Sequence, residues 1–434
     1  MIQRKAFIRY FFREVTNLRY ALLKTLQDAM EELPQQSDID MVVHHEDKAG
    51  IIDVIRKGPD IAQLHFHRKT YAVYISIYFN DGGYLKMDLI HRFDRKGILF
   101  LDPDKIIEEA YETQDGLKFA AHHHNFEYIM LFYLLNGAAV PQRYRDYFAG
   151  FTFEERAEIF SHVTSVYKVN INLLDELYET KTRFSKKIVG HVHRLPVNRG
   201  LLRMFHKARY ALDVFKDCFY HRGITVTFSG VDGAGKSTII REVKEVLEKK
   251  YRQRTVVLRH RPSLLPILSS LVKGRREAER QSRERLPRQG TNRNFASSLL
   301  RFFYYYTDYL IGQYYVYFRY TLKGYTVLYD RYYFDFIIDA RRSNIVLPRR
   351  FLRWCYSFIF KPQVNVFLFA PVEVIRERKN ELSAMDIKTL STEYHSLFSD
   401  LGRRKSTAKY LIINNTNIEH TISQVTQQCI RRAG

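Results

Sequence analysis

The sequence predicts an α/β protein in which a doubly wound parallel sheet follows a separate α+β domain. Three observations predict this fold class. A chain of 434 residues exceeds what one compact core usually holds. From residue 224 onward, short apolar runs alternate with helical periodicity, which is typical of a parallel sheet covered on both faces. Before that, helical and strand patterns alternate around a hairpin signal. We therefore expect domains at 1–180 and 222–434, joined by a basic connector at 181–221.

The elements of the first domain follow from periodicity and turn residues. We expect a helix over 3–30, strands over 38–43, 70–79 and 84–90, a helix over 48–55, and helical spacing from 125 to about 178. The two longer strands are rich in β-branched and aromatic residues. Between them, residues 80–83 read Asn-Asp-Gly-Gly, and these residue types tolerate the positive φ angles of a hairpin turn.

The second domain begins after a helix expected over 203–220. We expect strands over 224–228, 255–258, 326–329 and 364–369, a helix over 237–250, and a long aromatic helix over 295–322. Between the second strand and the aromatic helix, residues 259–294 are rich in arginine and show little periodicity.

Charge is distributed unevenly along the chain. Residues 1–180 hold 21 Lys and Arg against 27 Asp and Glu, whereas residues 181–434 hold 48 against 20. A segment this basic suits an anionic partner, such as a nucleotide, a nucleic acid or an anionic membrane surface. The three cysteines are far apart, so they predict no disulfide framework, and we expect a cytoplasmic protein.

Residues 230–238 (GVDGAGKST) fit the phosphate-binding pattern G-x-x-x-x-G-K-[ST], with an expected strand before and a helix after. The backbone N–H groups of such a loop surround the phosphates of ATP, and the helix adds the positive end of its dipole. The lysine is expected to reach the β- and γ-phosphates and the serine hydroxyl to ligate Mg²⁺. We expect ATP to be bound by Gly230, Gly233, Gly235, Lys236, Ser237 and Thr238.

Residues 227–238 and the Asp-Arg-Tyr sequence at 330–332 resemble thymidylate kinase, and the resemblance extends over about residues 222–430. It implies a P-loop kinase domain in which Asp330 and Arg331 lie beside the transferred phosphate and Asp232 contacts the acceptor. It also implies a lid helix after residue 371, where Arg376 and Arg378 are the candidate catalytic arginines.

The acceptor-binding region departs from the thymidylate kinase pattern. Residue 229, before the first glycine of the loop, is serine rather than glutamate, and residues 259–263 read Arg-His-Arg-Pro-Ser rather than Arg-Glu-Pro. Arg261 keeps a cation in this region, so we assign it to acceptor binding. The expected acceptor is a nucleotide or another phosphorylated or hydroxylated metabolite, with thymidylate itself as one alternative.

Asp38 and Asp40 lie two residues apart at an expected strand, so they share one face, and Asp88 lies in the second strand of the hairpin. Three such carboxylates suit a two-metal nucleotidyl transfer site. The pattern resembles the polymerase-beta type nucleotidyltransferases over about residues 15–135. The resemblance implies Mg²⁺ ligation by all three carboxylates, although residues 22–26 lack that superfamily's glycine pair.

Several weaker features leave alternatives open. His122–His124, His65 and His67 lie in no standard metal-ligand spacing. The aromatic helix suits a core or homodimer contact better than a base-stacking surface. The cations Lys273, Arg275, Arg276, Arg280, Arg283, Arg285 and Arg288 suit a loop that closes over an anionic acceptor, a nucleic-acid or membrane contact, or a solvated loop. The alternative function is a nucleotide-gated nucleic-acid or membrane-surface binding protein with little turnover.

Overall fold

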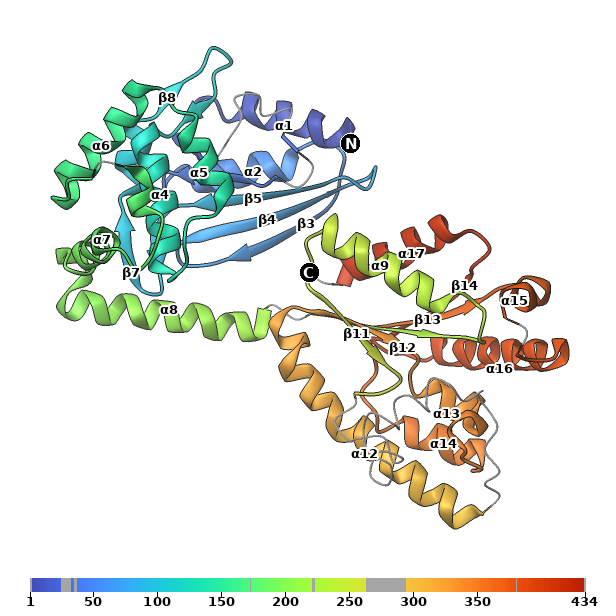
Figure 1. Ribbon diagram of the computed structural model, residues 1–434. Coiled ribbons are helices and arrows are strands. Elements are labelled where there is room, and N and C mark those ends of the chain that lie inside the picture. Colours follow the sequence, from blue (N-terminus) through green and yellow to red (C-terminus); the bar gives the residue numbers. More distant parts are fainter. Residues whose placement is uncertain are drawn as a thin grey trace. The chain divides into compact units, whose positions relative to one another are not determined.

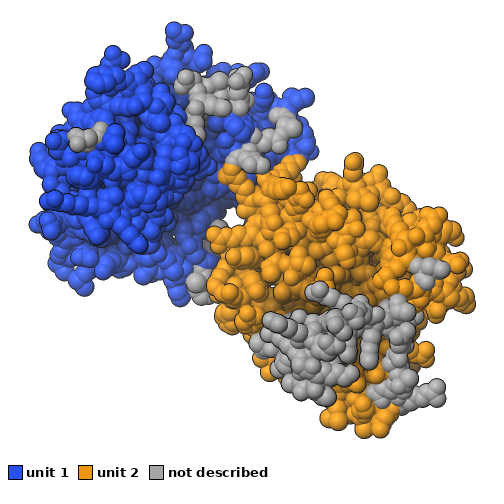
Figure 2. Space-filling view, viewed as in Figure 1, with its two compact units in different colours: residues 1–217 blue, residues 218–434 orange. Residues whose placement is uncertain are grey.

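The computed structural model describes residues 2–24, 33–34, 37–171, 173–220, 223–262, 294–379 and 381–432. The chain forms two compact units, residues 1–217 and 218–434, which we call unit 1 and unit 2 (Figure 2). The arginine-rich cluster between Lys273 and Arg288 lies outside the described residues. Among the described helices, none has the length and apolar character needed to cross a membrane.

Unit 1 contains a mixed seven-stranded sheet with the order β3-β4-β5-β2-β1-β9-β8 (Figure 1). Its strands are β1 (Tyr20–Leu23), β2 (Ile39–Val43), β3 (Ile61–Arg68), β4 (Ala72–Phe79), β5 (Tyr84–Ile90), β8 (Tyr111–Glu112) and β9 (Lys118–Phe119). The predicted hairpin of β4 and β5 is confirmed, and β5 runs parallel to β2. A separate ribbon is made by β6 (Phe93–Arg95) and β7 (Ile98–Leu101).

The two faces of this sheet are covered by different helices. One face packs on α1 (Ile2–Glu14) and α2 (Lys48–Lys57), whose residues Phe7, Phe11 and Ile51 join the core. The other face packs on helices from the second half of the unit. These helices are α3 (Pro103–Glu108), α4 (His122–Leu135), α5 (Gln142–Ala149), α6 (Phe153–Tyr167) and α7 (Arg183–His193), and the long helix α8 (Gly200–Tyr220) follows them in the chain. Alternate residues of each strand therefore belong to different cores.

The helix predicted over residues 3–30 ends at Glu14, so the prediction is wrong for residues 15–24, and residues 25–30 lie outside the described residues. Residues 20–23 form β1, which pairs antiparallel with β2, and all four residues of β1 are buried. A short apolar run has no clear helical or strand period, and here burial between two layers makes it a strand. The segment predicted as a connector forms α7 and α8, and Ile188 and Val192 of α7 belong to the core of unit 1.

Unit 2 confirms the predicted parallel sheet. Its order is β11-β12-β10-β13-β14, and every neighbouring pair is parallel. The strands are β10 (Thr225–Ser229), β11 (Thr255–Arg259), β12 (Thr326–Asp330), β13 (Val364–Phe369) and β14 (Lys409–Asn414). All five residues of β10 are buried, as expected for a strand covered on both faces.

Helices cover both faces of this sheet (Figure 1). One face carries α9 (Lys236–Lys249) and α17 (Ile418–Arg432). The other carries α12 (Phe295–Arg319), α13 (Phe334–Ile338), α14 (Arg349–Tyr356) and α16 (Ala384–Gly402), and α15 (Val372–Arg378) follows β13. The aromatic side chains predicted for α12 are partly core residues, since Phe302 and Tyr306 pack with Tyr333.

Candidate active site

The candidate site of unit 2 lies where β10 and β12 end, because residues 230–235 connect β10 to α9 there. Gly233 and Gly235 have φ angles of +89° and +85°, which side chains with a Cβ rarely adopt. At Gly235 a Cβ atom would also lie 2.4 Å from Nδ2 of Asn415. That amide donates to the carbonyl of Ala234 at 2.8 Å. Glycine therefore allows the loop to turn closely against the residue that follows β14.

Lys236 is the first residue of α9, and its side chain folds back over the loop. Its Nζ donates to the carbonyl oxygens of Gly230 and Val231, both at 2.8 Å. Burial, together with the nearby cation Arg331, lowers the pKa of Lys236 to about 7. An opposite charge placed at the loop would favour the protonated lysine and raise this pKa again.

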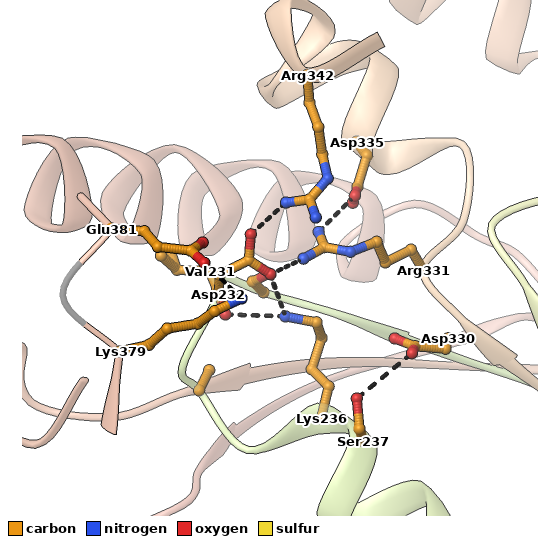
Figure 3. A network of polar contacts seen from close by, with 12 residues as sticks. Val231, Asp232, Lys236, Ser237, Asp330, Arg331, Asp335, Arg342, Lys379 and Glu381 are labelled. Carbon is orange, nitrogen blue, oxygen red and sulfur yellow. Dashed lines mark hydrogen bonds and ion pairs between the residues drawn. The ribbon is translucent and has the colours of Figure 1, made fainter. Parts of the chain in front are cut away.

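Asp232 lies at the centre of a charged network (Figure 3). Its two carboxylate oxygens accept from Arg331 and Arg342, and Nζ of Lys236 lies 3.9 Å away. Burial alone would raise the pKa of Asp232, but Arg331, Lys236 and Arg342 hold it well below its ordinary value. The network therefore brings three cations to one carboxylate.

Arg331 is positioned by its backbone and by a second carboxylate. It follows β12 with a φ angle of +78°, and its amide donates to the carbonyl of Phe228 at 2.9 Å. Its Nη1 donates to Asp335 Oδ2 at 2.7 Å, and Asp335 also accepts from the hydroxyl of Tyr394 at 2.8 Å. Arg331 is thus fixed on both sides while its guanidinium faces the phosphate loop.

Ser237 and Asp330 lie on the other side of Lys236. The hydroxyl of Ser237 is 3.5 Å from Asp330 Oδ2 (Figure 3). Two oxygen donors at this separation, beside a loop with the predicted phosphate-binding pattern, fit Mg²⁺, which is commonly bound by one or two protein oxygens together with substrate phosphates and water. The predicted Mg²⁺ ligand Ser237 therefore has Asp330 as its neighbour.

The remaining predicted residues of unit 2 are placed around this site. The guanidinium of Arg378, the last residue of α15, lies 3.5 Å from where a Cβ of Gly235 would be. Arg376, Arg378 and Thr238 are all exposed. Arg261 follows β11, and its Nη1 donates to the buried Asp308 at 2.7 Å. The charge of Arg261 is therefore compensated within the protein.

A pocket adjoins the charged network. It is lined by Gly230, Val231, Asp232, Arg331, Asp339, Arg342, Leu382, Leu390 and Tyr394. Sequence reasoning identified the first four lining positions within its motifs but missed Arg342, Tyr394 and the supporting residues Asp335 and Asn415. No local pattern could have found Arg342, because its partner Asp232 lies 110 residues earlier in the chain.

In unit 1 the structure brings together the three predicted carboxylates. Asp40 of β2 lies directly opposite Asp88 of β5, and Asp38 precedes Asp40 by two residues. Lys24 Nζ lies 3.3 Å from Asp40, and Lys86 Nζ lies 3.0 Å from Asp88 and 3.6 Å from Asp38. Burial, and the charge of Asp40, raise the pKa of Asp88 to about 6 although Lys86 opposes the shift.

The three carboxylates do not belong to the most compact groups of candidate metal ligands. Among the described residues, three groups of His, Asp and Glu side chains have ligand atoms within 4.8 Å of one another, and none includes Asp38, Asp40 or Asp88. Instead, each of these carboxylates is contacted by a lysine ammonium group. Metal ligation by the three aspartates stays a prediction of the sequence.

Comparison with known proteins adds no relative from which a function could be transferred. No protein-family model matches the chain, and no curated protein matches it with significance. The functional assignment therefore rests on the residues and geometry of the site itself.

Proposed function

We propose that unit 2 is an ATP-dependent phosphotransferase of the thymidylate kinase type. The observation that carries this proposal is the phosphate loop at the end of a central parallel strand, with a buried lysine and an Asp-Arg pair from the neighbouring strand beside it. Phosphoryl transfer depends mainly on positioning and on neutralising charge. Lys236 and Arg331 supply that charge from two sides of the loop.

The ATP side of the site is formed by the loop and by α9. The backbone N–H groups of residues 230–236 and the start of α9 suit the β- and γ-phosphates, and Lys236 exchanges its two carbonyl contacts for phosphate oxygens. Ser237 and Asp330 would hold Mg²⁺, which neutralises charge on the phosphates when it is bound. Arg378 lies close enough to the loop to contribute a further cation.

The acceptor side is formed by Asp232, Arg331 and Arg342. Two guanidinium groups suit a phosphate or carboxylate of the acceptor, and the carboxylate between them suits a hydroxyl group. A nucleotide or another phosphorylated metabolite carries both groups, so this class is the proposed acceptor. Thymidylate remains one member of the class to be tested.

Transfer from γ-labelled ATP to a panel of acceptors tests the proposal. The panel contains thymidylate, other nucleoside monophosphates, nucleosides, sugar phosphates and short oligonucleotides, all with Mg²⁺. We expect one labelled product, lost in Lys236→Ala and retained in Lys249→Ala, a control on the same helix whose exposed side chain pairs with Glu245. Failure of the whole chain to bind ATP would contradict the proposal.

A second candidate function comes from the charge of residues 181–434, which hold 48 Lys and Arg against 20 Asp and Glu. A nucleotide-gated protein that binds nucleic acid or an anionic membrane surface would use this excess. It would bind RNA, DNA or anionic vesicles with steep salt dependence and would show negligible turnover of small molecules. The same acceptor panel, together with binding measured at two salt concentrations, separates the two functions.

For unit 1 we derive no transfer step. The resemblance to nucleotidyltransferases remains the reason to test it, and incubation with nucleoside triphosphates and Mg²⁺ would detect release of pyrophosphate. The lysine contacts of Asp40 and Asp88 suit a domain that binds a nucleotide without reacting with it.

A further inference from the structure

Three histidines and their carboxylate partners gather between α4 and α6 of unit 1, in a cluster that contains none of the aspartates 38, 40 and 88. His123 and His124 lie in the first turn of α4, and His162 lies in the second half of α6. The ring centroids of His123 and His124 are 4.1 Å apart, and that of His162 lies 4.5 Å and 5.6 Å from them. Sequence spacing indicates no metal motif here, because His162 comes from another helix.

The two nitrogens of His124 have different surroundings. Nε2 lies 2.9 Å from Glu109 Oε2, at the end of α3. A carboxylate only accepts hydrogen bonds, so Nε2 carries a proton, and in the neutral ring Nδ1 presents its lone pair. Nδ1 is buried and makes no hydrogen bond to any residue that the structure describes, the carboxylate of Glu127 being 3.7 Å away. Buried polar atoms in proteins normally have a hydrogen-bond partner or a bound ion, so this nitrogen is a candidate ligand atom.

Two other donors face the same point as this lone pair. Glu127 Oε2 lies 3.7 Å from His124 Nδ1 and 3.0 Å from His162 Nε2. In a tetrahedral zinc site with bonds of about 2.0–2.1 Å, neighbouring ligand atoms are about 3.3–3.4 Å apart. The observed separations bracket this value, and these three groups form one of the clusters whose ligand atoms all lie within 4.8 Å of one another.

Glu127 is buried and oriented for this role. The hydroxyl of Tyr167 donates to Oε1, so Oε2 remains for the histidines. Tyr167 thus orients the carboxylate of Glu127, and Glu109 orients the ring of His124. Metal ligands in proteins are commonly oriented by hydrogen bonds of this kind to residues outside the site.

We infer that His124 Nδ1, Glu127 Oε2 and His162 Nε2 form a binding site for one divalent transition-metal ion, with Zn²⁺ as the best match. Two imidazole nitrogens and one carboxylate oxygen are donors that Zn²⁺ prefers over the harder Mg²⁺ and Ca²⁺. The fourth position would be taken by water. The proton on His162 Nε2 passes to water, the ring binds the metal as the neutral tautomer with its proton on Nδ1, and the ion joins α4 to α6. This site is independent of the proposed kinase.

His123 is a neighbour rather than a ligand. Its Nε2 lies 3.2 Å from Glu109 Oε2, and its Nδ1 contacts Glu158. Both ring nitrogens therefore face carboxylates. His122, the first residue of the triplet, lies 3.3 Å from Glu155 and outside the cluster, which makes it a matched control.

Zinc binding by the whole chain tests the site. The protein is stripped with a chelator, and Zn²⁺ is titrated in competition with a chromophoric chelator, while Co²⁺ reports tetrahedral coordination by its visible spectrum. We expect one equivalent to bind. Glu109→Gln, which changes a half-exposed outer partner, should weaken binding about 10–100-fold. His162→Ala should weaken it at least as much, and His122→Ala should leave it unchanged.

The outcomes separate the site from a set of ordinary ion pairs. No stoichiometric binding of Zn²⁺ or Co²⁺ by the stripped protein would overturn the inference. Equal affinity in the wild type, Glu109→Gln and His162→Ala, or an equal loss in His122→Ala, would overturn it as well. Far-UV circular dichroism establishes that each variant is folded before its affinity is compared. Phosphotransferase activity is not measured, so failure of the kinase proposal leaves this test intact.

Discussion

Replacing Asp232 by asparagine removes the charge that holds Arg331 and Arg342 together. The side chain is 14 % exposed, and its carboxylate contacts both guanidinium groups. Removing one partner of a buried ion pair typically costs about 3–5 kcal/mol, because the other charge is left uncompensated. Arg331 keeps Asp335, so we expect the lower end, a loss of about 3 kcal/mol in the free energy of unfolding of unit 2.

Urea unfolding followed by tryptophan fluorescence measures this loss in unit 2 alone, because the single tryptophan of the chain is Trp354. Asp400→Asn is the control, since its ion pair with Arg353 is largely exposed and should contribute less than about 1 kcal/mol. The double variant Asp232→Asn/Arg342→Gln should be more stable than Asp232→Asn, because one unpaired cation is gone. A single-variant loss below about 1 kcal/mol, or no recovery in the double variant, would refute the reasoning.

Three further predictions concern residues 230–238 of unit 2 and the sheet of unit 1. Burial lowers the pKa of Lys236 to about 7, so the free lysine is mostly neutral at pH 8. The phosphates of ATP should restore its charge, and ATP binding at pH 8 should therefore take up nearly one proton. For the same reason the affinity for ATP should fall as pH rises. Calorimetry in two buffers of different ionisation enthalpy measures this uptake, and Lys236→Met should abolish it. Gly235→Ala places a Cβ against Asn415 at a φ of +85°, so it should destabilise unit 2 by about 1–3 kcal/mol in urea unfolding. Gly402→Ala in α16 of the same unit should not, because its Cβ would meet only the Cβ of Tyr410 at an ordinary 3.8 Å. The folded-state pKa of Asp88, about 6, lies above its ordinary 3.8, so unit 1 should lose stability as pH rises between these values. Thermal unfolding of Asp88→Asn should lack this loss, and an unchanged pH dependence would contradict the assignment.

The parts of the site that sequence reasoning found are continuous in the chain. The loop from Gly230 to Thr238 and the Asp330–Arg331 pair each form a short motif with a strand before it, and local spacing is enough to predict them. The parallel sheet of unit 2 was predictable for the same reason, since its strands are short, mainly apolar runs that alternate with helices. These sequence motifs therefore predict the residues that are proposed to bind phosphate.

The supporting residues were missed because they meet the site only through tertiary structure. Asn415 contacts Ala234 across 181 residues, and Tyr394 contacts Asp335 across 59. The same limit explains β1, where the four apolar residues 20–23 fit a helix locally but pair with β2 in the fold. Local propensity is weak for such runs, and the neighbouring strand decides their structure.

The parallel pairing of β2 with β5 has a consequence for the order of folding. The hairpin of β4 and β5 closes a short turn, whereas β2 meets β5 only after α2, β3 and β4 have been accommodated between them. Loop-closure entropy favours the short connection first. The aspartates of unit 1 are therefore apart while their sheet begins to form, and their mutual repulsion opposes a late step of assembly rather than its nucleation.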